Sequence, residues 1–188
     1  MLTYVSQRCI LEHFEANKRL HFAARCSSIR GIERSIPLRL HTLSLTSSSI
    51  TLNEIIYEII QGSYLNTILG WLNKFEVGIT HQKGSMTFVR DLSKDANRIR
   101  ATGKLFNDLL GRRCKIFVGN LSIGYFVCPD IQTMKIQANN VKFVKRFDKN
   151  VWKWINVSSF PLKSLDIHSE DAIALYPRIR FARKMILR

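Results

Sequence analysis

Residues 1–36 carry apolar side chains at the spacing of short amphipathic helices. Val5, Cys9, Ile10, His13 and Phe14 recur at helical intervals and predict a first helix. Asn17 is expected to cap a second helix that carries Leu20, Ala23 and Ala24. Ser27 or Ser28 is expected to cap a third helix with Ile29 and Ile32, which ends before Pro37. The pattern therefore predicts a helical head over residues 1–36.

From residue 37 onward the apolar positions are spaced mostly as in strands. Asn53-Glu54 separates two apolar runs and predicts a two-residue hairpin turn, with a helix over 53–60 as the alternative. A helix is expected from about Lys94 to Leu110, with Ser93 as its N-cap and Gly111 at its exit. Strands are expected at 115–118, 121–127, 134–137, 141–144, 151–155 and 162–167. Residues 37–188 are thus predicted to form a mixed strand and helix domain, and the whole chain an α+β protein.

A leucine-like spacing recurs along this second part of the chain. The clearest instances of L-x-x-L-x-L begin at Leu40, Ile131, Leu162 and Ala182. The last three starts lie 31 and 20 residues apart, near the 20–29 residues of leucine-rich repeats. The pattern indicates irregular leucine-rich-repeat-like strands, and an ordinary α+β sheet is the alternative. Because the apolar stretch 185–187 stands at the very end, we expect it to dock in a sheet and the chain to be a truncated member of something longer.

Charge and composition narrow the classes of function. The net charge of +15 favours polyanions or acidic protein surfaces as partners, although the basic residues are spread along the chain. No apolar run approaches the roughly 18 residues of a membrane helix. The first residues lack the pattern of a secretory signal, so an intracellular location, cytoplasmic or nuclear, is expected.

Motifs of catalysis and of cofactor or metal binding are missing from the sequence. It contains no G-x-S-x-G, no P-loop, no G-x-G-x-x-G after a strand and no H-E-x-x-H. The four cysteines are far apart and form no C-x-x-C pair. We therefore expect no enzyme activity, no cofactor and no metal, and a function in binding another macromolecule.

One short motif points to single-stranded RNA. Ile116–Leu121 matches the first strand of RNA-recognition motifs, in which an aromatic residue, here Phe117, stacks on a base. Trp152 and Trp154 alternate and could add a stacking surface. The companion strand of that fold requires glycine, and Lys145–Trp152 contains none. RNA binding is therefore the alternative hypothesis.

Several sequence blocks resemble a nematode-expanded family grouped with F-box proteins. These blocks are Leu2-Thr3-Tyr4, Cys9-Ile10-Leu11-Glu12, Ala16-Asn17-Lys18-Arg19, Ser35-Ile36-Pro37-Leu38-Arg39-Leu40, Gly111 to Val118 and Ser159-Phe160-Pro161-Leu162-Lys163-Ser164-Leu165. The resemblance implies an F-box-like head that binds the Skp-type adaptor of a cullin ubiquitin ligase, and a repeat-like region that recognises a substrate. Within the head it implies Ile10, Leu11, Phe14 and Leu20 as partner contacts. The leading hypothesis is thus a non-catalytic protein-binding module of undetermined oligomeric state.

Overall fold

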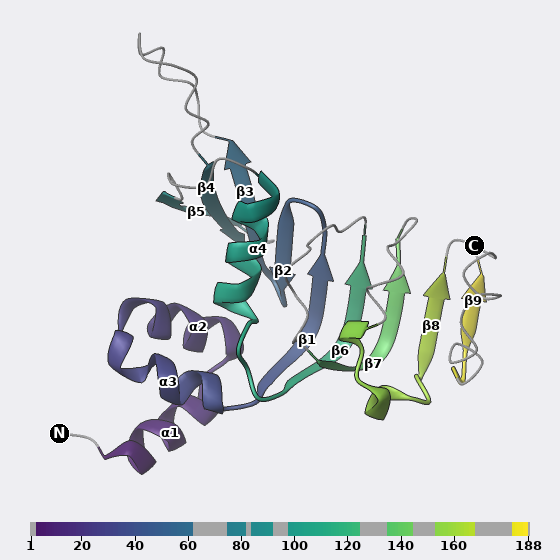
Figure 1. Ribbon diagram of the computed structural model, residues 1–188, viewed down its shortest axis with the longest axis horizontal. Coiled ribbons are helices and arrows are strands. Elements are labelled where there is room, and N and C mark those ends of the chain that lie inside the picture. Colours follow the sequence, from purple (N-terminus) through teal and green to yellow (C-terminus); the bar gives the residue numbers. More distant parts are fainter. Residues whose placement is uncertain are drawn as a thin grey trace, which may run out of the picture.

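The computed structural model describes residues 3–61, 75–81, 84–91, 98–124, 135–144, 153–167 and 182–187. Within these residues three helices form an N-terminal head, and nine strands form one mixed sheet with a fourth helix packed on it (Figure 1). The head lies beside the N-terminal end of the first strand. The α+β class predicted from the sequence is confirmed.

The head contains α1 (Tyr4–His13), α2 (Ala16–Arg25) and α3 (Ser27–Ser35). The predicted cap of the second helix is wrong, because the carboxylate of Glu15 accepts the backbone N–H groups of Asn17 and Lys18. Asn17 instead lies inside α2, where its buried amide donates to the carbonyl of Leu52 at 2.9 Å. The Asn17 side chain, which the sequence pattern predicted as a helix cap, therefore makes a tertiary contact instead. Neither Ser27 nor Ser28 caps α3, whose N-cap is Cys26.

The sheet joins an antiparallel half to a parallel half in the order β5-β4-β3-β2-β1-β6-β7-β8-β9. Its strands are β1 (Leu38–Leu45), β2 (Ser49–Leu52), β3 (Ile55–Gln61), β4 (Phe75–His81), β5 (Gly84–Asp91), β6 (Ile116–Ile123), β7 (Ile136–Phe143), β8 (Ser164–Ile167) and β9 (Met185–Leu187). Strands β1 to β5 pair antiparallel in chain order. Strands β1, β6, β7, β8 and β9 pair parallel. The expected strand at residues 185–187 is present and forms the edge of the parallel half.

The hairpin predicted at Asn53-Glu54 is confirmed, and the alternative helix over 53–60 is not formed. Leu52 and Ile55 are register partners, so Asn53 and Glu54 alone form the turn between the two strands. Asn53 has a φ of 54°, which asparagine tolerates better than most residues. Its Oδ1 also accepts the backbone N–H of His41 at 2.8 Å and that of Thr42 at 3.2 Å. The turn is therefore anchored to β1 as well as closing the hairpin.

Two of the parallel strands are longer than the sequence pattern predicted. Residues 115–118 and 121–127 were expected as separate strands, yet β6 runs unbroken through Gly119 and Asn120. In the same way β7 spans the gap expected between 137 and 141. In each strand every second residue is buried, except that one interval in the middle is three residues long. The apolar pattern of each strand therefore resembles that of two short strands. The strand expected at 151–155 is absent from the described residues 153–155, where Ile155 makes only an isolated bridge to Ile136.

The parallel strands stack equivalent apolar side chains into ladders. Register partners in one ladder are Leu43, Leu121, Val141, Leu165 and Met185, which are 78, 20, 24 and 20 residues apart. The sequence pattern that begins at Leu40 is in phase with this ladder, because Leu40 pairs with Val118 and Val118 with Ala138. The start predicted at Ile131 lies outside the described residues. The residue of β7 that is in register with Leu40 is Ala138, so a repeat unit in phase with Leu40 would start at Ala138 and not at Ile131. The leucine-rich-repeat interpretation stays a prediction.

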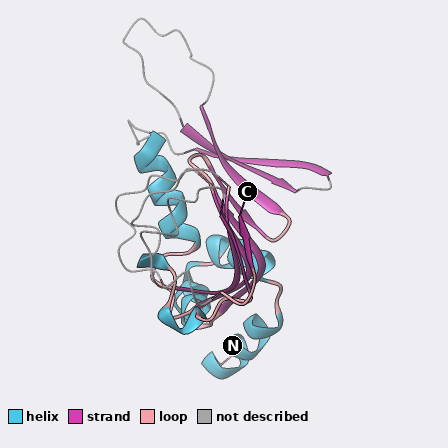
Figure 2. Ribbon diagram, turned by 90° about the vertical axis from the view of Figure 1, so that its right-hand side faces the viewer, coloured by secondary structure: helices cyan, strands magenta, loops and turns pink. Residues whose placement is uncertain are grey.

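Helix α4 (Arg98–Leu109) covers one side of the sheet, as Figure 2 shows. Its buried residues Ala101, Leu105 and Phe106 share one core with the apolar sides of the parallel strands. The predicted helix start and its Ser93 cap lie outside the described residues. At its exit the helical hydrogen bonds continue to Gly111, and Arg112 rather than glycine adopts the left-handed conformation, with a φ of 57°. The short 3-10 helix η2 (Val157–Ser159) leads into β8.

Candidate partner-binding surface

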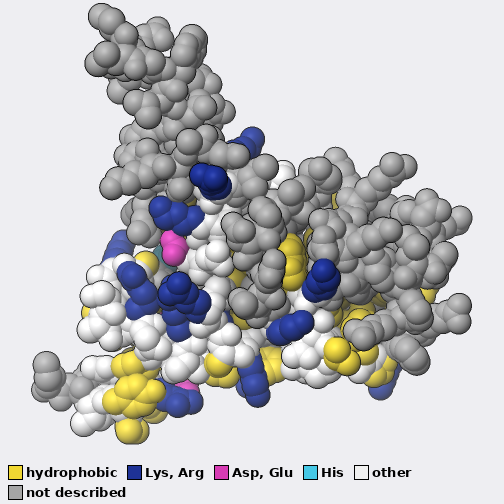
Figure 3. Space-filling view, viewed as in Figure 1, with side chains coloured by type: hydrophobic (Ala, Val, Ile, Leu, Met, Phe, Trp, Pro, Cys, Tyr) yellow, Lys and Arg dark blue, Asp and Glu magenta, His cyan; other side chains and the backbone are white. Residues whose placement is uncertain are grey.

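The helical head exposes a group of large apolar side chains. Ile10 is 44%, Phe14 40% and Phe22 49% exposed, and the Phe14 and Phe22 rings meet edge to face with centroids 6.2 Å apart. We call these three residues the head patch. Figure 3 shows hydrophobic side chains gathered over α1. Exposed aromatic residues grouped in this way are typical of protein-interaction sites.

Only two of the four contacts implied by the resemblance belong to the head patch. Ile10 and Phe14 are exposed, whereas Leu11 and Leu20 are 2% and 6% exposed. Leu11 packs in a small core within the head, and Leu20 packs in the main core beneath α2. Leu11 and Leu20 therefore shape the head rather than offer a contact surface. Phe22 was missed because its spacing in α2 does not distinguish a buried from an exposed position.

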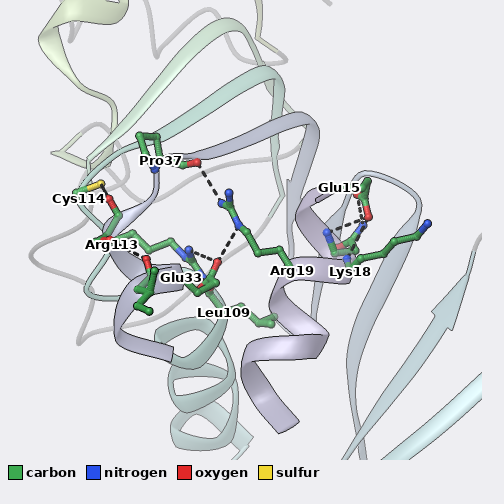
Figure 4. A network of polar contacts seen from close by, with 11 residues as sticks. Glu15, Lys18, Arg19, Glu33, Pro37, Leu109, Arg113 and Cys114 are labelled. Atoms are coloured by element: carbon green, nitrogen blue, oxygen red, sulfur yellow. Dashed lines mark hydrogen bonds and ion pairs between the residues drawn. The ribbon is translucent and has the colours of Figure 1, made fainter. Parts of the chain in front are cut away.

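A buried charge network fixes the head on the sheet domain (Figure 4). The Glu33 carboxylate in α3 accepts Nε of Arg19 at 3.1 Å and both terminal nitrogens of Arg113 at 2.8 and 2.7 Å. Arg19 also donates to the carbonyl of Pro37, and Arg113 to that of Leu109 at the end of α4. The three charged side chains are at most 5% exposed. The orientation of the head relative to α4 and β1 is thus defined by charge-assisted hydrogen bonds.

This network holds two guanidinium groups and one carboxylate, so it carries an excess positive charge. Burial lowers the pKa of Arg19 below its ordinary value, and the nearby Arg113 acts in the same direction against the attraction of Glu33. A lowered pKa is expected for Arg19, because the carboxylate of Glu33 that balances its charge also balances the charge of Arg113. Sequence reasoning could not find the network, because Glu33 and Arg113 are 80 positions apart.

A second contact joins α2 to the antiparallel half of the sheet. The ring of His21 lies edge to face with that of Tyr57, and its Nε2 lies 2.9 Å from the Tyr57 hydroxyl. That hydroxyl donates to Asn17 Oδ1 at 3.4 Å. Burial lowers the pKa of His21, with Arg25 acting in the same direction, and burial raises the pKa of Tyr57. A cavity of about 150 Å³ adjoins this contact, between the head, α4 and β4.

The side of the parallel strands opposite the core carries a group of polar side chains that contact one another. The amide of Asn140 donates to Asn120 Oδ1 at 2.8 Å, and the hydroxyl of Ser164 donates to Asn140 Oδ1 at 2.9 Å. Two residues further along these strands, the Lys142 ammonium on β7 lies 3.8 Å from the Asp166 carboxylate on β8. These side chains form a row across β6, β7 and β8, which we call the strand row. It offers hydrogen-bonding groups from three neighbouring strands on a regular spacing.

The two residues of the RNA hypothesis that the structure describes, Phe117 and Trp154, do not form a stacking platform. Phe117 is half-buried on β6, between two parallel neighbours, and its ring lies beneath the guanidinium of Arg39 at 4.9 Å. Trp154 is only 6% exposed and packs against Phe106. This corrects the expectation for Trp154, because its indole belongs to the core. Trp152 lies outside the described residues. RNA binding therefore stays a prediction supported by the net charge.

The described residues contain neither a candidate metal site nor a candidate membrane-spanning helix. No group of three or more His, Cys, Asp or Glu side chains there could hold a metal ion. No helix in that part of the chain combines the length and the hydropathy needed to cross a membrane.

Comparisons of the chain with protein-family models, with curated proteins and with solved structures found no match.

Proposed function

We propose that this chain is a non-catalytic protein-binding module whose head patch docks a Skp-type adaptor of a cullin ubiquitin ligase. The observation that carries the proposal is the exposure of Ile10, Phe14 and Phe22 on a head that has a separate buried core of its own. Apolar side chains that the head does not need for packing are available to a partner. The F-box-like order of three short helices before a sheet domain supports the same partner class.

The buried junction between the head and the sheet domain supports the second half of the proposal, substrate recognition. A recognition subunit holds its substrate at a defined position relative to the adaptor, so its two binding surfaces need a fixed geometry. The buried network of Arg19, Glu33 and Arg113 provides such a connection between the head and the sheet domain. The strand row, which extends across parallel strands as in repeat proteins, is the surface that we assign to the substrate.

The test is a titration of the full chain against a purified Skp-type adaptor by isothermal calorimetry. The double variant Phe14→Ala/Phe22→Ala removes the aromatic pair. Truncation of a central interface aromatic costs about 2 kcal/mol or more, so binding is expected to weaken at least about 30-fold.

The matched control is Val144→Ala/Val157→Ala, which removes exposed apolar groups elsewhere on the molecule and leaves the affinity unchanged. Circular dichroism verifies that both double variants are folded. Equal affinities of the two double variants, or a folded wild-type chain with no binding up to about 1 mM, would remove the adaptor role.

A further inference from the structure

A second cavity lies between α1, α2 and the start of β1. Its volume is about 380 Å³, within the range of small-ligand sites. Its charged lining consists of Arg8, Arg19, Arg39 and Glu12, while Phe14 and Ile36 contribute apolar wall. With these four side chains ionised, the lining has a net charge of +2. The cavity is therefore suited to a ligand that carries two negative charges.

Arg19 brings an incompletely neutralised cation to the wall of this cavity. Its guanidinium uses Nε for Glu33 and one terminal N–H for the carbonyl of Pro37. A guanidinium has five N–H donors, and in the described part of the chain the remaining ones of Arg19 meet no acceptor. Because Glu33 is also bound by both terminal nitrogens of Arg113, the network has a positive charge left over. An anion in the cavity would compensate that charge.

Arg39 supplies a second available guanidinium from the sheet. Its charged group lies over the ring of Phe117, 4.9 Å from the centroid, which orients the plane of the guanidinium without occupying its N–H edge. Among the described residues no carboxylate pairs with Arg39. Arg8 at the rim is already paired with Glu12, at 2.9 Å. Arg19 and Arg39 are therefore the cations that a ligand would meet with donors available.

We propose that this cavity binds a phosphate monoester dianion. The forked donors of arginine match the oxygens of phosphate, and a phosphate monoester carries a charge of about −1.5 to −2 at neutral pH, which balances the lining. Arg39 and Arg19 contact the phosphate oxygens, and the group that bears the phosphate lies against Phe14 and Ile36. The ligand is either a small phosphorylated molecule or a phosphorylated side chain of another protein. Phe14 belongs to both this cavity and the head patch, but Arg39 lies outside the head patch, so Arg39→Gln tests phosphate binding separately from adaptor binding.

The experiment is a calorimetric titration of the full chain with phenyl phosphate at an ionic strength of about 0.15 M, where surface charges are screened beyond about 8 Å. Parallel titrations use benzoate, a short peptide with phosphoserine and the same peptide without phosphate. The test variant is Arg39→Gln, and the matched control is Arg25→Gln, which removes the same charge from an exposed position of α2 outside the cavity. Both positions are exposed, so neither change disturbs the core.

Saturable binding of phenyl phosphate that Arg39→Gln weakens about tenfold or more, and Arg25→Gln leaves unchanged, is the expected result. No saturable binding, or equal weakening by the two variants, would overturn the proposal, because attraction would then come from the overall basic charge. Benzoate binding as tightly as phenyl phosphate would overturn the assignment to a dianion. Tighter binding of the phosphoserine peptide than of phenyl phosphate identifies a protein as the source of the ligand. The reverse order identifies a small molecule.

Discussion

Replacement of Glu33 by glutamine tests whether the buried network holds the head on the sheet domain. The substitution keeps the size of the side chain and removes the negative charge that Arg19 and Arg113 share. It also turns one acceptor into a donor, which then faces a terminal nitrogen of Arg113 previously 2.7 Å from Glu33 Oε2. The variant therefore loses charge compensation and gains an unfavourable donor–donor contact.

The structure sets the expected magnitude. Removal of one partner from a buried ion pair costs about 3–5 kcal/mol, because the remaining charge is left uncompensated. Arg113 is 1% exposed but lines the smaller cavity, and Arg19 lines the larger one, so water in these cavities can partly hydrate both cations. We therefore expect about 3 kcal/mol, the lower end of that range. For a chain of 188 residues this corresponds to a fall in Tm of about 6–12 °C.

Urea unfolding, followed by tryptophan fluorescence and circular dichroism, measures the effect. Glu12→Gln is the control, because Glu12 also pairs with an arginine but at a half-exposed site. Its midpoint should match that of the wild type, since exposed pairs contribute little. The triple variant Arg19→Met/Glu33→Leu/Arg113→Met should recover much of the lost stability, because no buried charge remains. Equal stabilities of Glu33→Gln and Glu12→Gln would refute the reasoning.

Two further predictions concern close packing and pH. Gly119→Ala should destabilise the chain by about 1–3 kcal/mol in urea unfolding, because its Cβ would lie 2.7 Å from the carbonyl oxygen of His41. Gly31→Ala, in α3 with nothing within 4 Å of the added Cβ, should stabilise by about 0.5–1 kcal/mol; a loss at both glycines would contradict the steric argument. Since burial lowers the pKa of His21 below 6.5, the unfolded chain takes up this proton first as pH falls. Stability should therefore decline from about pH 7 to about pH 5, and His21→Gln should reduce that slope; an unchanged slope in His21→Gln would contradict the assignment.

Local pattern was sufficient where neighbouring residues decide the structure. The three head helices, the hairpin at Asn53-Glu54 and the strand at 185–187 were all predicted, because each depends on the spacing of apolar side chains or on the conformational range of one turn. The pattern was misleading at β6 and β7. There the buried side shifts by one residue within a continuous strand, and Gly119-Asn120 resembles a turn in isolation. Register with β1 keeps that segment extended.

The sequence pattern also did not determine which apolar side chains of the head are exposed to solvent. Helical spacing predicted the two helices α1 and α2 but did not show that Leu11 and Leu20 are buried while Phe14 and Phe22 are exposed. The distinction depends on which side of each helix the other helices and β1 cover. Only the packed arrangement contains that information, so the head patch could be recognised in the structure alone.

The sequence by itself determined a helical head, an α+β domain, a strongly basic surface and the absence of familiar catalytic motifs, because these follow from composition and short-range periodicity. The tertiary structure decided which charges are buried and what they face. Arg19, Glu33 and Arg113 come from three separate segments, and Arg39 meets Phe117 only because β1 and β6 are parallel neighbours. Contacts of such long sequence separation depend on how the elements pack, and the cavity proposed to bind phosphate joins distant segments in the same way.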